Sequence, residues 1–187
     1  DSAYVKLVIT VFMFLGGVNF ALLFKASTGQ IGELWKNEVF RTYVYVIGVM
    51  MILFVITIIT NNQVHSWESL TIDPLFQIVS VLTSTGLIVG NFENWGGFVV
   101  ALMFLLMFFG ASAGSTSGGA KLDRMIFLAK NIRNEVYRCL HPNAICSVRV
   151  NGKVLPADVV NKVIAFLCLY VILIVIGGLI LTAIGIP

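Results

Sequence analysis

The chain has 187 residues, of which 58% are hydrophobic and 11% are charged, and its mean hydropathy is +0.96. Soluble domains are about 45–50% apolar and about 25% charged, so this composition excludes an ordinary soluble protein and predicts an integral membrane protein. The net charge of +3 is spread unevenly, because no Lys or Arg lies between Arg41 and Lys121. Basic residues gather in 25–41 and 121–162, and the positive-inside rule places both segments in the cytoplasm.

The first part of the chain contains two predicted spans. The apolar run Val5–Phe24 is long enough to cross a bilayer as one helix and predicts a span within residues 1–25. Residues 26–42 are more polar and form a predicted cytoplasmic connection, after which Tyr43–Thr60 predicts a span that returns outward. Three small or amide residues in the first run are interpreted as helix-packing positions, namely Gly16, Gly17 and Asn19.

The stretch from Asp73 to Leu87 predicts a helix that stops halfway across the membrane. Asp73 can cap a helix and Pro74 suits its first turn, so a helix is expected over residues 73–83. Eleven residues rise about 16 Å, whereas the bilayer hydrocarbon is about 30 Å thick. The helix is followed by small hydroxyl residues and a glycine, whose unpaired carbonyls are tolerated in a membrane only beside protein or water.

Carbonyls at the negative end of a short helix favour a cation. Residues 83–87 are therefore interpreted as a selectivity filter in which backbone carbonyls bind the ion, with these candidate site residues: Thr83, Ser84, Thr85 and Gly86. A short buried helix followed by an ordinary turn is the alternative, because Thr-Ser-Thr-Gly is a common turn composition.

A second interruption follows the filter. The apolar run Phe98–Phe109 rises only about 18 Å, which is too short to cross. It leads into Gly110–Gly119, which contains only Gly, Ala, Ser and Thr and disfavours helix, so we predict an exit helix broken inside the membrane, its loop facing the water path beneath the filter. A phosphate-binding loop is rejected, because Ala120 precedes Lys121 and Leu122 stands where Ser or Thr is required.

Charged residues return after this loop. Lys121–Leu140 predicts an amphipathic helix whose basic residues meet lipid headgroups or a cytoplasmic partner. An Asn-Gly pair within residues 141–160 suits a type I′ turn and predicts a small cytoplasmic β-hairpin. Val163–Ile186, within residues 161–187, predicts the last span. The expected fold is thus an all-α membrane protein built as span, pore helix, filter and span, with one small β-hairpin.

Five stretches of the chain together point to a known family. They are residues 17–22, residues 37–43, Thr83–Gly86, Gly110–Gly119 before Lys121, and His141-Pro142. This combination, which covers nearly the whole chain, resembles the Trk/Ktr/HKT superfamily of potassium transporters, closest to its bacterial TrkH pore subunits. Leu87 departs from the aromatic residue that often follows the filter glycine, which affects packing behind the filter more than the carbonyl ring.

The resemblance implies four repeats of span, pore helix, filter and span around one central pore. Residues 1–25 would close a preceding repeat, residues 43–140 would form one complete repeat, and residues 161–187 would open the next. Gly86 matches the filter glycine of the family. The glycine-rich loop matches an intramembrane gate, whose candidate residues here are Gly110, Gly114, Ser115, Thr116, Gly118 and Gly119.

The implied activity is gated, channel-like potassium ion uptake across the bacterial inner (plasma) membrane, with this chain supplying one filter segment and the gating loop. Implied partners are a second copy in a homodimer, cytoplasmic nucleotide-binding regulatory subunits of the TrkA type, and the lipid bilayer, but no nucleic acid. A secondary transporter that binds a small organic solute between broken helices is the alternative. An enzyme is not expected, because two separated histidines and peripheral carboxylates form no catalytic or metal-binding cluster.

Overall fold

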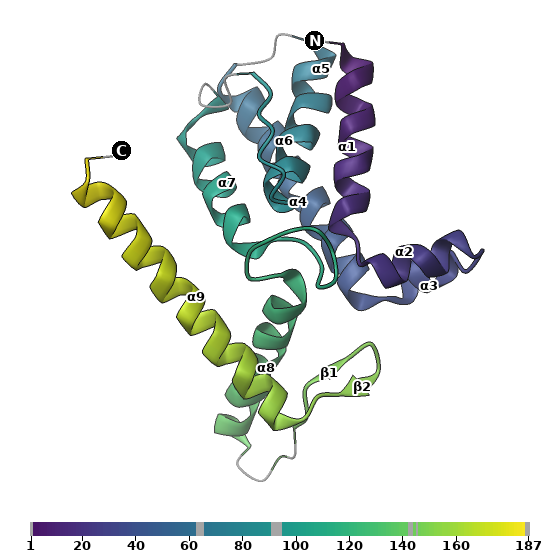
Figure 1. Ribbon diagram of the computed structural model, residues 1–187, viewed down its shortest axis with the longest axis vertical. Helices are drawn as coiled ribbons and strands as arrows, with labels where there is room; N and C mark the ends of the chain where they lie inside the picture. The colour runs from purple at the N-terminus through teal and green to yellow at the C-terminus, as the bar shows by residue number, and fades with distance from the viewer. Residues whose placement is uncertain (1, 63–65, 91–94, 142–143, 145, 186–187) are drawn as a thin grey trace. The chain divides into compact units, whose positions relative to one another are not determined.

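The computed structural model describes residues 2–62, 66–90, 95–141, 144 and 146–185, which are mostly helical (Figure 1). The chain divides into two compact units, residues 1–123 and 124–187. The helices of the first unit are α1 (Ala3–Gly17), α2 (Phe20–Ser27), α3 (Gly32–Lys36), α4 (Glu38–Thr60), α5 (Trp67–Leu70), α6 (Ile72–Leu82) and α7 (Gly97–Phe109). Helix α8 (Leu122–Leu140) continues into the second unit, which also holds β1 (Arg149–Val150), β2 (Lys153–Val154) and α9 (Ala157–Ala183).

Helix α6 is packed among α1, α4 and α7 in the first unit (Figure 1). It is only eleven residues long, and Ile78 and Leu82 on it are fully buried. Phe54 and Ile58 of α4 and Leu106 of α7 are fully buried as well. A helix that is apolar on most of its faces is stable only inside such a shell. The longer helices therefore enclose a half-length helix and hold its two ends in place.

Two helices in the described part of the chain are long and apolar enough to cross a membrane, Glu38–Thr60 and Asp158–Ala183 within α9. Helix α4 begins five residues before the predicted Tyr43, because the Asn37 side chain accepts hydrogen bonds from the backbone N–H groups of Val39 and Phe40 at 2.9 and 3.1 Å. The predicted polar connection over residues 26–42 is therefore largely helical. It contains the end of α2, all of α3 and the first turn of α4.

The single helix predicted over Val5–Phe24 is wrong. Helix α1 ends at Gly17, α2 begins at Phe20, and the two are bent by 110°. The physical reason is a set of competing hydrogen bonds. The Asn19 side chain caps α2, accepting from Ala21 N at 2.9 Å, and the Gly17 carbonyl accepts a hydrogen bond from a residue far along the chain instead of continuing the helix.

Gly17 lies at a point of close approach between three segments. A Cβ atom at this position would overlap the Tyr43 hydroxyl on α4 and would lie 2.8 Å from Thr83 Cγ2 at the end of α6. The Tyr43 side chain is itself fully buried and donates to the Phe14 carbonyl at 3.3 Å. This geometry agrees with the predicted helix-packing role of Gly17.

We expect Gly17→Ala to lower the free energy of unfolding of the complete protein by about 1–3 kcal/mol, because an added methyl group must displace buried neighbours. Gly48→Ala on α4 is the matched control, since a Cβ there has nothing within 4 Å. Thermal denaturation in detergent compares the two variants. Equal melting temperatures for Gly17→Ala and wild type would show that α1 does not need this close approach.

The second unit contains the predicted hairpin. Strands β1 and β2 pair antiparallel, with Arg149 opposite Val154. Asn151 and Gly152 between them have φ angles of 50° and 76°, and two positive φ angles are what a type I′ turn requires. The predicted β-hairpin is therefore confirmed. Helix α9 begins at Ala157, six residues before the predicted start of the last span, directly after Pro156 in an extended conformation.

Candidate functional site

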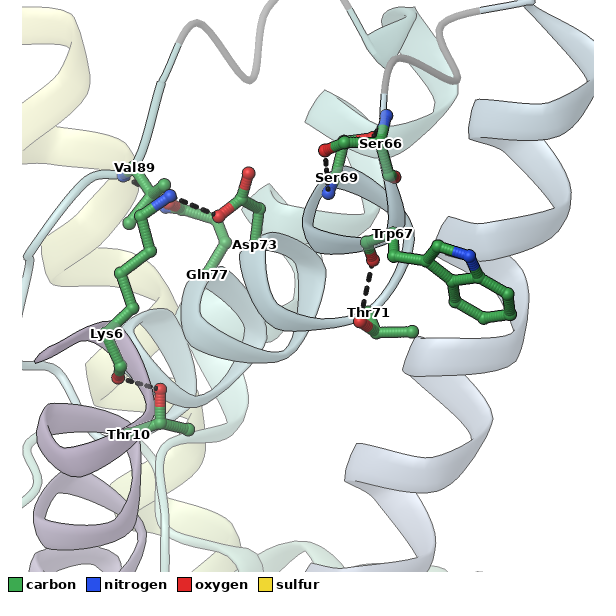
Figure 2. A network of polar contacts seen from close by, with 9 residues as sticks. All are labelled: Lys6, Thr10, Ser66, Trp67, Ser69, Thr71, Asp73, Gln77 and Val89. Atoms are coloured by element: carbon green, nitrogen blue, oxygen red, sulfur yellow. Dashed lines mark hydrogen bonds and ion pairs between the residues drawn. The ribbon is translucent and has the colours of Figure 1, made fainter. Parts of the chain in front are cut away.

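The helix predicted over residues 73–83 is found as α6, Ile72–Leu82. Its first turn differs from the prediction, because the cap position is Thr71 and not Asp73. The Asp73 carboxylate instead accepts a hydrogen bond from Lys6 Nζ of α1 at 2.7 Å, in an ion pair whose side chains are 15% (Lys6) and 18% (Asp73) exposed (Figure 2). The Lys6 ammonium group thus binds the Asp73 carboxylate, which was predicted to cap the helix. The two residues lie 67 positions apart along the chain, so the sequence alone did not predict this pair.

The predicted filter residues follow α6 with their amides turned toward it. Thr83 N donates to Val79 O at 2.9 Å, Ser84 N to Val81 O at 3.1 Å, and Thr85 N to Ser80 O at 2.9 Å. Positive φ angles at Ser84 (58°) and Gly86 (76°) reverse the chain direction after the helix. No hydrogen bond to the carbonyl oxygens of residues 83–86 is found within the described residues. The segment therefore keeps its acceptors available while its donors are satisfied.

Thr83 differs from the other candidate filter residues. Its side chain is 5% exposed, whereas Ser84, Thr85 and Gly86 are exposed. The Thr83 hydroxyl donates to Val79 O at 2.7 Å and lies 2.8 Å from the Thr85 hydroxyl. Thr83 thus anchors the end of α6, because its hydroxyl bonds back to the last turn of the helix.

A hollow of about 250 Å³ lies beside this segment. Its lining comes from α6, the filter and α7, and consists of Ser80, Val81, Ser84, Gly86 and Met107. The lining is mainly apolar, so this hollow by itself does not indicate an ion-binding site.

The predicted interruption after α7 is present. Helix α7 ends at Phe109 and α8 begins at Leu122, with no regular structure between them. The loop is attached to the α1–α2 bend by backbone hydrogen bonds: Ser112 N donates to Gly17 O at 3.2 Å, and Phe20 N donates to Gly114 O at 3.0 Å. These bonds satisfy polar groups that a membrane interior would not solvate.

Two further side chains hold the middle of the loop, and both act on Ala113. Asn19 Nδ2 donates to Ala113 O at 2.6 Å, and the Asp123 carboxylate accepts a hydrogen bond from Ala113 N. Sequence reasoning missed both roles. The Asn19 side chain could have been recognised as a cap from its position before Phe20, but its bond to the loop has no local signal.

The candidate gate residues differ in what they contact. Gly110 and Gly119 meet at its base, where a Cβ on Gly119 would lie 3.3 Å from Gly110 Cα. Thr116 contacts α1, its hydroxyl donating to Gly16 O at 3.0 Å. A Cβ on Gly118 would lie 3.7 Å from Ser84 Oγ. The loop therefore lies against both α1 and the filter segment. Gly114 contacts Asn19, and Ser115 bonds within the loop to Ser112 O.

A half-length helix followed by backbone carbonyls that accept no hydrogen bond in the described residues, next to a second helix interrupted by a polar loop, is typical of membrane transport proteins. The family model described as "TrkH: Cation transport protein" matches residues 1–187, and the chain belongs to this family. The predicted family resemblance and the all-α membrane fold with a small hairpin are thereby confirmed.

Individual relatives agree with this assignment. The chain is 30% identical over 190 residues to the Trk system potassium uptake protein TrkH of Escherichia coli (strain K12), covering 100% of this chain and 39% of that protein. It is 32% identical over 191 residues to TrkH of Vibrio parahaemolyticus, covering 99% of this chain and 39% of that protein.

The crystal structure of the potassium transporter TrkH from Vibrio parahaemolyticus matches with a TM-score of 0.91 at 30% identity, covering 99% of this chain and 40% of that chain. This chain thus spans about two fifths of the length of the relatives it matches.

Proposed function

We propose that this chain is one filter-bearing repeat, with parts of its neighbours, of a potassium uptake protein of the bacterial inner membrane. The observation that carries the proposal is the orientation of residues 83–86, whose amides donate to α6 while their carbonyls accept nothing in the described residues. Relatives that align with the whole chain are named as potassium uptake proteins.

In the proposed mechanism, the carbonyls of residues 83–86 replace part of the hydration shell of a potassium ion. The ion is the transported substrate, and no bond is made or broken. Full coordination requires the three other repeats of the complete protein. Residues 1–25 close the preceding repeat, residues 43–140 form the repeat with this filter, residues 141–160 form a cytoplasmic hairpin segment, and residues 161–187 open the next repeat.

The loop Gly110–Gly119 is the proposed gate. Its contact with Ser84 through Gly118 supports a position directly beside the filter. Its hydrogen bonds to Gly16 and Gly17 make the present arrangement one defined state. Opening requires the loop to leave these partners together, as expected for a segment with two discrete arrangements.

The proposed assembly is a homodimer with cytoplasmic nucleotide-binding regulatory subunits of the TrkA type. Support comes from the charge distribution, because the second unit is rich in basic residues on the side that the positive-inside rule assigns to the cytoplasm. Lys130, Arg133 and Arg149 line one hollow of about 520 Å³ between α8 and the hairpin segment. Such a surface is suited to acidic groups on a partner.

Isotopic rubidium uptake by vesicles containing the complete protein tests the proposed function. We expect rubidium to enter and excess potassium to compete with it, because both ions fit a ring of carbonyls. Labelled amino acids and sugars serve as controls and are expected to stay outside. Uptake of such a solute without rubidium uptake would instead establish a secondary transporter with broken helices.

A further inference from the structure

Two buried polar side chains of α6 face the chain segment that returns from the filter. Gln77 is 3% exposed and Ser80 is fully buried. Burying polar groups inside a membrane protein is costly unless they are hydrogen-bonded. Both residues have partners, and these partners are backbone groups of residues 87–89, which follow the filter segment and belong to no helix.

The hydrogen bonds hold the backbone on both sides of Gly86. Ser80 Oγ donates to Leu87 O at 2.7 Å, and Ser80 O accepts from Thr85 N at 2.9 Å. Gln77 Oε1 accepts a hydrogen bond from Val89 N at 3.2 Å, and Figure 2 shows the Gln77 side chain beside Val89. Gly86 itself has a φ of 76° and nothing within 4 Å of its Cβ position, and its own hydrogen bond, from its N to Ser80 O, is long at 3.5 Å.

Asp73, Gln77 and Ser80 follow one another at spacings of four and three, so they form a single polar stripe along one face of α6. Asp73 at the start of this stripe is paired with Lys6 of α1. Figure 2 shows the Lys6–Asp73 pair beside Gln77 and Val89. The Lys6–Asp73 pair joins α6 to α1, whereas Gln77 and Ser80 join α6 to residues 87–89 after the filter segment.

We infer that Gln77 and Ser80 are positioning residues that set the direction of the Gly86 carbonyl and so determine which monovalent cation passes. The inference rests on the proposed function. Discrimination between potassium and sodium depends on the number and field strength of carbonyls around the ion. Gly86 has only one long hydrogen bond of its own, so the orientation of this flexible residue depends on the bonds that hold its flanking residues.

The test uses the complete protein in vesicles and measures the ratio of potassium to sodium permeability. Ser80→Ala removes the donor to Leu87 with little change of shape, and Gln77→Leu removes the acceptor for Val89. We expect either change to lower the ratio by about tenfold, the effect of losing one buried hydrogen bond.

Thr10→Val on α1 is the matched control. It removes another buried hydroxyl, which donates only to Lys6 O of its own helix at 2.8 Å, and we expect an unchanged ratio. Wild-type ratios in both Ser80→Ala and Gln77→Leu would overturn the inference while leaving the proposed function intact. If Gln77→Leu does not reach the membrane, Ser80→Ala alone decides. Absence of rubidium uptake by the wild-type protein would overturn the proposed function itself.

Discussion

Gly86→Ser in the complete protein is expected to reduce discrimination between potassium and sodium by about tenfold or more. Gly86 has a φ of 76°, a conformation that costs other L-residues roughly 1–2 kcal/mol, and about 1.4 kcal/mol corresponds to a tenfold change. The space around its Cβ position is open, so the serine side chain fits and the change acts on the backbone. Bi-ionic permeability or competition of sodium with rubidium uptake measures the effect.

Gly29→Ser provides the control for this prediction. Gly29 has a φ of 90° and nothing within 4 Å of its Cβ position, but it lies in the turn after α2, away from the filter. A serine at position 29 imposes the same kind of backbone strain but lies outside the proposed ion route. Equal selectivity of Gly86→Ser and wild type would show that Gly86 is not part of the selectivity filter. An equal loss of selectivity in Gly86→Ser and Gly29→Ser would show that the effect comes from general backbone strain.

Gly110→Ala is expected to raise basal rubidium flux several-fold in the absence of regulatory subunits. A Cβ at Gly110 would overlap the carbonyl oxygen of Gly118, and the φ of 65° disfavours alanine as well. The base of the loop must then open, which pulls Gly118 away from Ser84 and weakens the bonds to α1. Uptake by vesicles that contain only the complete pore protein measures the flux.

Gly152→Ala is the matched substitution for this experiment. Gly152 has a φ of 76° and an open surrounding, but it lies in the β-hairpin turn of the second unit. We expect it to leave basal flux unchanged. If Gly110→Ala protein is folded and shows wild-type flux, the gate is located elsewhere than in Gly110–Gly119.

Local signals in the sequence were sufficient to predict three elements. The half-length helix predicted over residues 73–83 is present with one residue of difference at each end, because its length is limited by the hydroxyl and glycine residues that follow. The break predicted at Gly110–Gly119 and the turn at Asn151-Gly152 are present for similar reasons. In each case a few adjacent residues either cannot continue a helix or favour positive φ angles.

Tertiary contacts decided where α1 ends and what surrounds the filter. The bend after Gly17 depends on hydrogen bonds to Ser112, and the Asn19 side chain reaches Ala113, 94 positions away. The Lys6–Asp73 pair likewise joins helices that are distant in sequence. A helix ends where other partners for its carbonyls and side chains become available, and those partners exist only after the chain has folded.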